Sequence, residues 1–71
     1  MDSCEQFFNE HKSYLEKETR CNASYGRGFI IFRKDADILV QFHMADMPLT
    51  DEALGFILHV TNAIKAGIIR T

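Results

Sequence analysis

The sequence predicts a small α+β domain in which one antiparallel β-hairpin is flanked by two helices. Residues 3–20 and 50–66 carry apolar side chains at helical spacing, whereas residues 29–44 read as two strands separated by a short polar turn. A chain of 71 residues forms at most one domain. We therefore expect a single domain over residues 1–71 with the element order α-β-β-α.

The composition narrows the class of protein. With 46% hydrophobic and 25% charged residues, the chain resembles a folded globular protein and not a disordered one. The net charge of −2 lacks the basic excess typical of nucleic-acid binders. No run of 18 apolar residues predicts a membrane span, and the acidic start, Met1-Asp2-Ser3, is unlike a signal peptide. We expect a cytoplasmic protein.

The first helix is expected over residues 3–20. Ser3 followed by Gln6 matches a capping box at its N-terminus. If the helix reaches residue 21, Cys4 and Cys21 lie about 25 Å apart along its axis, too far for a disulfide. Both cysteines are expected as free thiols. The apolar stripe of this helix contains Cys4, Phe7, Phe8, His11, Tyr14 and Leu15.

The hairpin is expected from a strand over residues 25–34, a turn at Asp35-Ala36 and a second strand over residues 38–44. This turn places Arg33 opposite Ile38 and Phe32 opposite Leu39. Alternation then divides the side chains between two faces. The face expected to form the core carries Phe29, Ile31, Ile38, Val40, Phe42 and Met44. The other face carries Ile30, Phe32, Leu39, Gln41 and His43, and it is the candidate for contact with a partner.

The second helix is expected to follow an N-cap at Thr50 and to run to about residue 66, with Gly67 at the C′ position. Its apolar side chains, Phe56 among them, spread over an arc of about 200°, roughly twice what a helix lying on one sheet requires. This helix is therefore expected to have neighbours on two sides.

These features predict a homodimer. A lone two-stranded hairpin is marginally stable in water. The second strand is nearly continuous in apolar residues, as in the middle of a sheet, whereas Gly26, Gly28 and Arg33 suit an edge. We expect the second strands of two chains to pair, giving a four-stranded sheet; the alternative is face-to-face packing. The interface candidates are Ile30, Phe32, Leu39, Gln41, His43 and Phe56.

No pattern predicts catalysis or metal binding. The three histidines and two cysteines show neither Cys-x-x-Cys nor His-x-x-x-His spacing. Nothing in the sequence brings a nucleophile, a histidine and a carboxylate together. We expect no catalytic residue, no metal ligand and no cofactor.

The leading hypothesis is a non-catalytic interaction protein, an adaptor, regulator or inhibitor that binds another protein. The second is a nucleic-acid-binding dimer using Arg27, Arg33 and Lys34, although Asp35 and Asp37 reduce the local positive charge. The third is a small-ligand carrier or enzyme with a site in a dimer cleft near His43 and His59.

Overall fold

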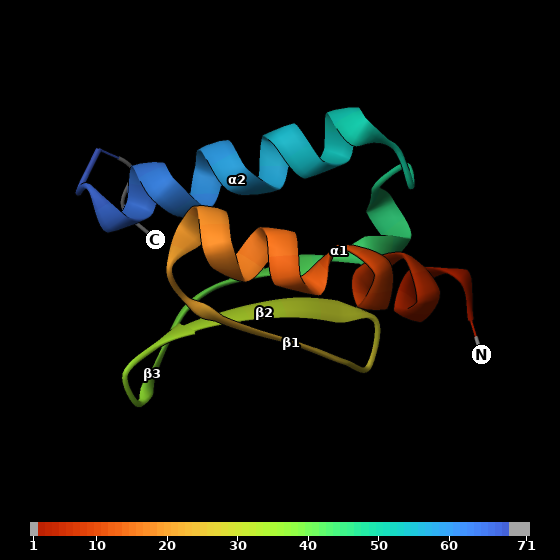
Figure 1. The fold of residues 1–71 in the computed structure, drawn as a ribbon, viewed down its shortest axis with the longest axis horizontal. Helices are drawn as coiled ribbons and strands as arrows, with labels where there is room; N and C mark the ends of the chain where they lie inside the picture. Colours follow the sequence, from red (N-terminus) through yellow and green to blue (C-terminus); the bar gives the residue numbers. More distant parts are fainter. Residues whose placement is uncertain (1, 69–71) are drawn as a thin grey trace.

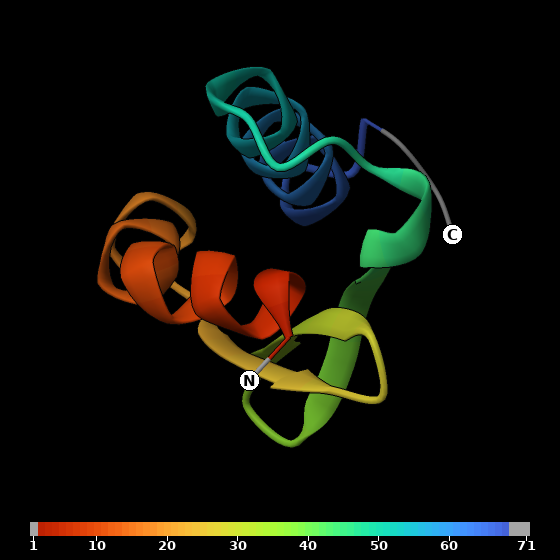
Figure 2. The same cartoon turned by 90° about the vertical axis from the view of Figure 1, so that its right-hand side faces the viewer.

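The computed structural model describes residues 2–68 and shows an α+β fold, which confirms the predicted class. In chain order its elements are α1 (Ser3–Thr19), β1 (Asn22–Gly26), β2 (Phe29–Lys34), β3 (Asp37–His43), the 3-10 helix η1 (Met44–Asp46) and α2 (Asp51–Lys65). The strands form one antiparallel sheet in the order β1-β2-β3. Both helices lie on the same side of it (Figures 1 and 2). The other side of the sheet is the outer face.

Helix α1 begins one residue earlier than the capping-box pattern suggests. Its N-cap is Asp2, whose Oδ1 accepts a hydrogen bond from the Glu5 amide at 2.7 Å. Ser3 is already the first helical residue, so the predicted Ser3 cap is wrong. At the other end Arg20 adopts a left-handed conformation with φ of 57°, and the chain turns directly into β1.

The segment predicted as one strand over residues 25–34 is in fact part of a tight hairpin. Arg27 and Gly28 have φ angles of 55° and 84°, the pair of left-handed conformations that a type I′ turn requires. Gly26 pairs with Phe29 across this turn. Residues 22–26, which show no clear periodicity, therefore form β1. The sheet has three strands within one chain, which is enough for independent stability.

The β2–β3 hairpin has the predicted turn but a different register. Lys34 pairs with Asp37 across Asp35-Ala36, and Arg33 pairs with Ile38. Phe32 then pairs with Val40, which leaves Leu39 as the extra residue of a β-bulge. From that point the register is displaced by one residue from the expected pairing.

This displacement reverses the predicted faces of β2. Ile30 and Phe32 are fully buried beneath the helices, whereas Phe29 and Ile31 are only partly buried on the outer face. The assignment of Ile30 and Phe32 to a partner interface is therefore wrong. On β3 the expected orientation holds for Phe42, which is buried, and fails for Ile38, which is exposed.

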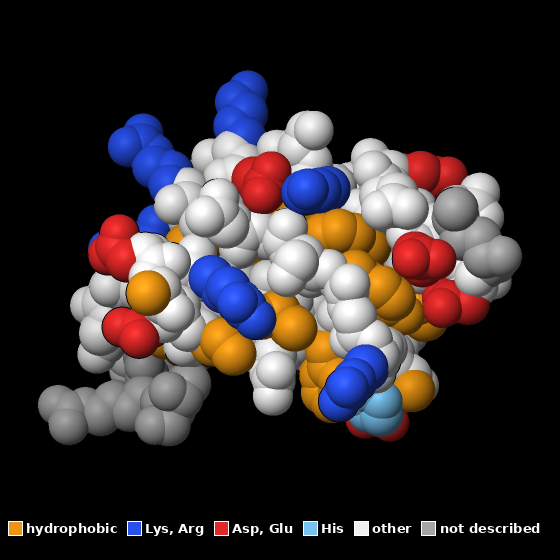
Figure 3. All heavy atoms as spheres, turned by 90° about the horizontal axis from the view of Figure 1, so that it is seen from below, with side chains coloured by type: hydrophobic (Ala, Val, Ile, Leu, Met, Phe, Trp, Pro, Cys, Tyr) orange, Lys and Arg blue, Asp and Glu red, His pale blue; other side chains and the backbone are white. Residues whose placement is uncertain are grey.

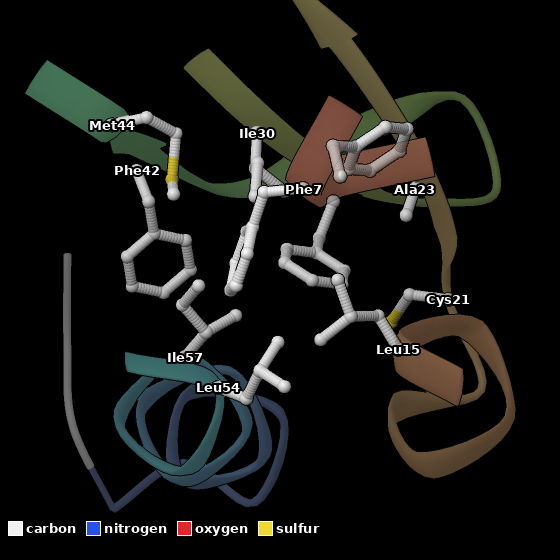
Figure 4. Packing of buried hydrophobic residues seen from close by; sticks show 11 residues of the cluster. Phe7, Leu15, Cys21, Ala23, Ile30, Phe42, Met44, Leu54 and Ile57 are labelled. Carbon is white, nitrogen blue, oxygen red and sulfur yellow. The ribbon is translucent and has the colours of Figure 1, made fainter. Parts of the chain in front are cut away.

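The core lies between the sheet and the two helices (Figure 4). Phe32 and Phe42 meet edge to face with ring centroids 6.1 Å apart, one of the favourable geometries for aromatic pairs. The accessible surface of 4821 Å² is close to the roughly 4,500 Å² expected for a folded monomer of this mass. One chain thus closes its own core. The helices contribute Phe7, Phe8, Leu15, Leu54 and Ile57 to this cluster.

Helix α2 begins and ends as predicted. The Thr50 hydroxyl accepts from the Ala53 amide at 3.4 Å, which confirms the N-cap. Gly67, with φ of 78°, occupies the C′ position of a Schellman motif, in which the Ile68 amide donates to the Ala63 carbonyl at 2.9 Å. Lys65 also donates from its Nζ to the Thr19 carbonyl, so the end of α2 is attached to the end of α1.

Candidate interaction surface

The two edges of the sheet are β1 and β3, because β2 lies between them. This corrects the expectation that the first strand of the predicted hairpin is an edge strand, because β2 lies in the middle of the sheet. In the part of the chain that the structure describes, β3 pairs with β2 and has no strand on its other side. An unpaired edge presents backbone N–H and C=O groups that can pair with another chain.

The β1 edge is protected by helix α1. The Ala23 amide donates to the Glu16 carboxylate at 2.9 Å, so a side chain replaces the missing strand at this position. Tyr25, two residues further along β1, donates its hydroxyl to Asp2 at 3.5 Å. Burial and the Asp2 carboxylate raise the pKa of this hydroxyl above its ordinary value of 10.0. Residues of α1 and its N-cap thus cover one edge of the sheet.

Large apolar side chains flank the β3 edge from two elements. Ile38, in β3 itself, is 53% exposed, and Phe56, in α2, is 55% exposed. The Phe56 ring packs edge to face on Phe42 with centroids 6.1 Å apart, which fixes Phe56 beside β3. We call the edge of β3 together with Ile38 and Phe56 the β3 surface. Charged residues are absent from its centre, Ile38 to Phe42.

The outer face of the sheet is partly apolar. Figure 3 shows hydrophobic side chains across the middle of this face, with charged side chains around them. Phe29 and Ile31 contribute from β2, whereas Gln41 and His43 are exposed polar residues of β3. The Phe29 and His43 rings stack with centroids 4.7 Å apart. This face adjoins the β3 surface at Ile38, which belongs to both.

His43 forms a solvent-exposed pair with Asp46. Its Nδ1 lies 3.3 Å from the Asp46 carboxylate, and the two side chains are 48% and 81% exposed. Exposed pairs of this kind contribute little to stability. His59, in α2, lines a surface pocket together with Asn62, and His43 does not line this pocket. The structure therefore does not bring the two histidines together. Within residues 2–68, no three His, Cys, Asp or Glu side chains converge to hold a metal ion.

Of the remaining interface candidates, Gln41, His43 and Phe56 are exposed and Leu39 is partly buried. The sequence reasoning missed Ile38, because the bulge that turns Ile38 outward follows from the pairing of two strands and has no signature in β3 alone.

The three basic residues proposed for nucleic-acid contacts are separated. Arg27 lies in the β1–β2 turn, whereas Arg33 and Lys34 lie at the far end of β2. The part of β2 from Phe29 to Arg33, which lies between the two groups, alone spans about 13 Å. Asp35 and Asp37 adjoin the second group. The geometry therefore offers no continuous basic patch from these residues.

A further depression, the helix cleft, lies between α1 and α2 and has a volume of about 350 Å³. Gly55 lies in its wall, within α2, where a glycine costs about 1 kcal/mol of helix stability relative to alanine. A side-chain carbon built on Gly55 would meet nothing within 4 Å, so the packing of the chain does not require glycine there. The residues that line the cleft are His11, Tyr14, Asp51, Leu54 and Gly55.

None of the helices in residues 2–68 combines the length and the apolar character needed to cross a bilayer. Cys4 is partly buried and Cys21 is buried, and both are free thiols, as predicted. No protein-family model matches this chain, and comparisons with curated proteins and with solved structures found no similar protein.

Proposed function

We propose that this protein is a non-catalytic protein-binding module, an adaptor, regulator or inhibitor, that works as a homodimer joined along β3. The observation that carries the proposal is the unpaired β3 edge, with Ile38 and Phe56 each more than half exposed beside it. A strand edge flanked by apolar side chains is costly to leave in water and is suited to pairing with another strand.

A second copy of the chain fits this edge well. Two β3 strands related by a twofold axis run antiparallel and present identical residues to each other. The stretch from Ile38 to Phe42 is uncharged, so no like charges meet near the axis. Because each chain contributes three strands, the joined sheet has six, in place of the four expected from a two-stranded hairpin.

The flanking side chains add to the pairing. Completing the burial of a half-exposed Ile38 or Phe56 contributes about 1 kcal/mol for each side chain. A twofold dimer gains each contribution twice. It also leaves Phe29 and Ile31 on an outer face that is twice as wide, and we assign this face to the protein partner.

We also propose a cytoplasmic location. Free thiols such as those of Cys4 and Cys21 persist in reducing compartments, whereas small secreted domains usually use their cysteines in disulfides.

Sedimentation equilibrium tests the dimer. The wild-type chain is expected to have twice its 8.2 kDa mass at micromolar concentration. Ile38→Lys, which places a charge on the β3 surface, is expected to give a monomer. Ser24→Lys is the matched control, because Ser24 is an exposed strand residue on β1. A monomeric wild type, or an Ile38→Lys variant that remains dimeric, contradicts the proposal.

The partner-binding role has its own test. Phe29→Ser is expected to leave the dimer mass unchanged and to abolish retention of a partner that the wild-type chain retains on a column. A partner retained equally by wild type and Phe29→Ser contradicts the assignment of the outer face.

A further inference from the structure

The helix cleft combines one aromatic ring, two hydrogen-bond acceptors and an apolar floor. Leu54 is buried and forms the floor, whereas Tyr14 and Asp51 are exposed at the sides. Tyr14 is 47% exposed, which is high for a ring on the apolar stripe of α1. The cleft lies between the helices and is lined by no residue of the β3 surface, so it is independent of the proposed dimer.

His11 lines the cleft from α1, and two contacts with Phe7 fix its ring. Its Nδ1 lies 2.8 Å from the Phe7 carbonyl oxygen. A carbonyl only accepts hydrogen bonds, so Nδ1 carries the proton, and Nε2 of the neutral ring is left as an acceptor. The Phe7 ring, 4.6 Å from the imidazole, further fixes its orientation.

The electrostatics of the cleft favour a cation. The N-terminus of α2 carries about half a positive charge, but Asp51 and Glu52 in its first turn bring two negative charges. No lysine or arginine lines the cleft. The carboxylate of Asp51 and the π face of Tyr14 are both groups that attract an ammonium or a guanidinium.

Gly55 supplies the second observation. It lies one helical turn after Asp51 and lines the same cleft. Gly55 weakens α2 at a position where the packing of the chain leaves room for a side chain. The missing side chain opens α2 to the close approach of a group from outside the molecule.

From these observations we propose that the helix cleft binds the side chain of an arginine or lysine presented by a partner protein. The charged group lies between Asp51 and the Tyr14 ring, and the aliphatic stem lies over Leu54 and Gly55. Three of the five lining residues are exposed, so the cleft is an open groove that a side chain on the surface of a larger partner can reach.

The test uses N-acetyl-argininamide, titrated into the full isotope-labelled chain while backbone amide shifts are recorded. Saturable shifts are expected at Gly55 and its neighbours. The matched ligand N-acetyl-citrullinamide has nearly the same shape without the charge, and it is expected to bind up to about fivefold more weakly. Equal affinities for the two ligands, or no saturable shift for either, overturn the proposal.

Two variants locate the site. Asp51→Asn and Glu52→Gln each remove one carboxylate from the first turn of α2, but only Asp51 lines the cleft. Asp51→Asn is expected to weaken binding of N-acetyl-argininamide about fivefold, and Glu52→Gln less than about twofold. Gly55→Leu, which fills the cleft, is expected to abolish the shifts. Equal losses in the Asp51 and Glu52 variants assign the effect to overall charge and overturn the site.

Discussion

The two edge strands of the sheet, β1 and β3, differ in whether residues of the same chain protect them. At β1 the chain supplies its own cover: Glu16 accepts the Ala23 amide, and the N-cap residue Asp2 accepts the Tyr25 hydroxyl. At β3 the neighbouring residues Ile38 and Phe56 are apolar and more than half exposed. Polar side chains of the same chain protect the β1 edge, whereas the β3 edge has apolar side chains beside it, and our proposal assigns this edge to pairing with a second copy.

The largest expected change in stability tests which side chains of β2 point into the core, an assignment on which this comparison depends. Phe32→Ala removes a fully buried ring and is expected to lower the free energy of unfolding by about 3–5 kcal/mol. Ile31→Ala, the adjacent residue on the outer face, is expected to cost less than about 1.5 kcal/mol. Urea unfolding of both variants measures the difference. A larger loss for Ile31→Ala than for Phe32→Ala would mean that β2 is turned as the sequence alone suggested, and similar losses would contradict the assigned faces.

The next prediction concerns the covered edge. Glu16→Ala leaves the Ala23 amide without its acceptor and is expected to destabilise the fold by about 1 kcal/mol. Glu18→Ala is the control, because Glu18 is exposed, and it is expected to stay within about 0.5 kcal/mol of wild type. Thermal unfolding distinguishes them. A Glu16 variant as stable as the control would show that the carboxylate does not protect β1.

Asp2 acts at the same edge and as the cap of α1. Asp2→Ala is expected to cost about 1 kcal/mol through loss of the cap. It is also expected to move the pKa of Tyr25 back toward its ordinary value. Absorbance titration at alkaline pH measures the second effect, and an unchanged Tyr25 midpoint would contradict the pairing with Asp2.

The raised pKa of Tyr25 also makes stability depend on pH in one direction. The folded chain holds the Tyr25 proton more tightly than the unfolded chain does. Its contribution is therefore complete below the ordinary pKa of 10.0 and is lost as the pH rises through the folded pKa. Wild-type stability is expected to fall more steeply than that of Asp2→Ala in this alkaline range. Parallel curves for the two proteins would contradict this linkage.

The smallest expected effect on stability belongs to the open edge. Gln41→Lys places a charge at an exposed position of β3 and is expected to change the unfolding free energy of the monomer by less than about 0.5 kcal/mol. In a twofold pairing the two lysines lie near each other and weaken the dimer. Unfolding measured at dilute and concentrated protein separates these effects. If the Gln41→Lys variant dimerises as well as wild type, the dimer interface does not include this part of β3.

Much of the fold follows from local sequence signals. The helices, the Thr50 cap, the Gly67 terminus and the turn at Asp35-Ala36 each depend on a few neighbouring residues, and the structure has all of them. The sequence did not predict the type I′ turn at Arg27-Gly28, because arginine rarely adopts a left-handed conformation and the glycines of this segment suggested an edge strand.

The register of β2 against β3 could not be read in the same way. It depends on a bulge at Leu39, and a shift of one residue moves every side chain of a strand to the opposite face. Both faces of β2 are apolar near Phe29 to Phe32, so the hydrophobic pattern did not distinguish them. For this reason the interface candidates on β2, Ile30 and Phe32, are buried and not exposed. Phe56 was assigned from helical spacing alone, and it is exposed, as an interface residue must be.

Hydrogen–deuterium exchange of the β3 amides as a function of protein concentration tests the central claim most directly. The account predicts that amides of β3 become protected as the concentration rises through the dimerisation range, while those of β1 exchange at a constant rate. Exchange of β3 that is independent of concentration would contradict the claim that this edge joins two copies of the chain.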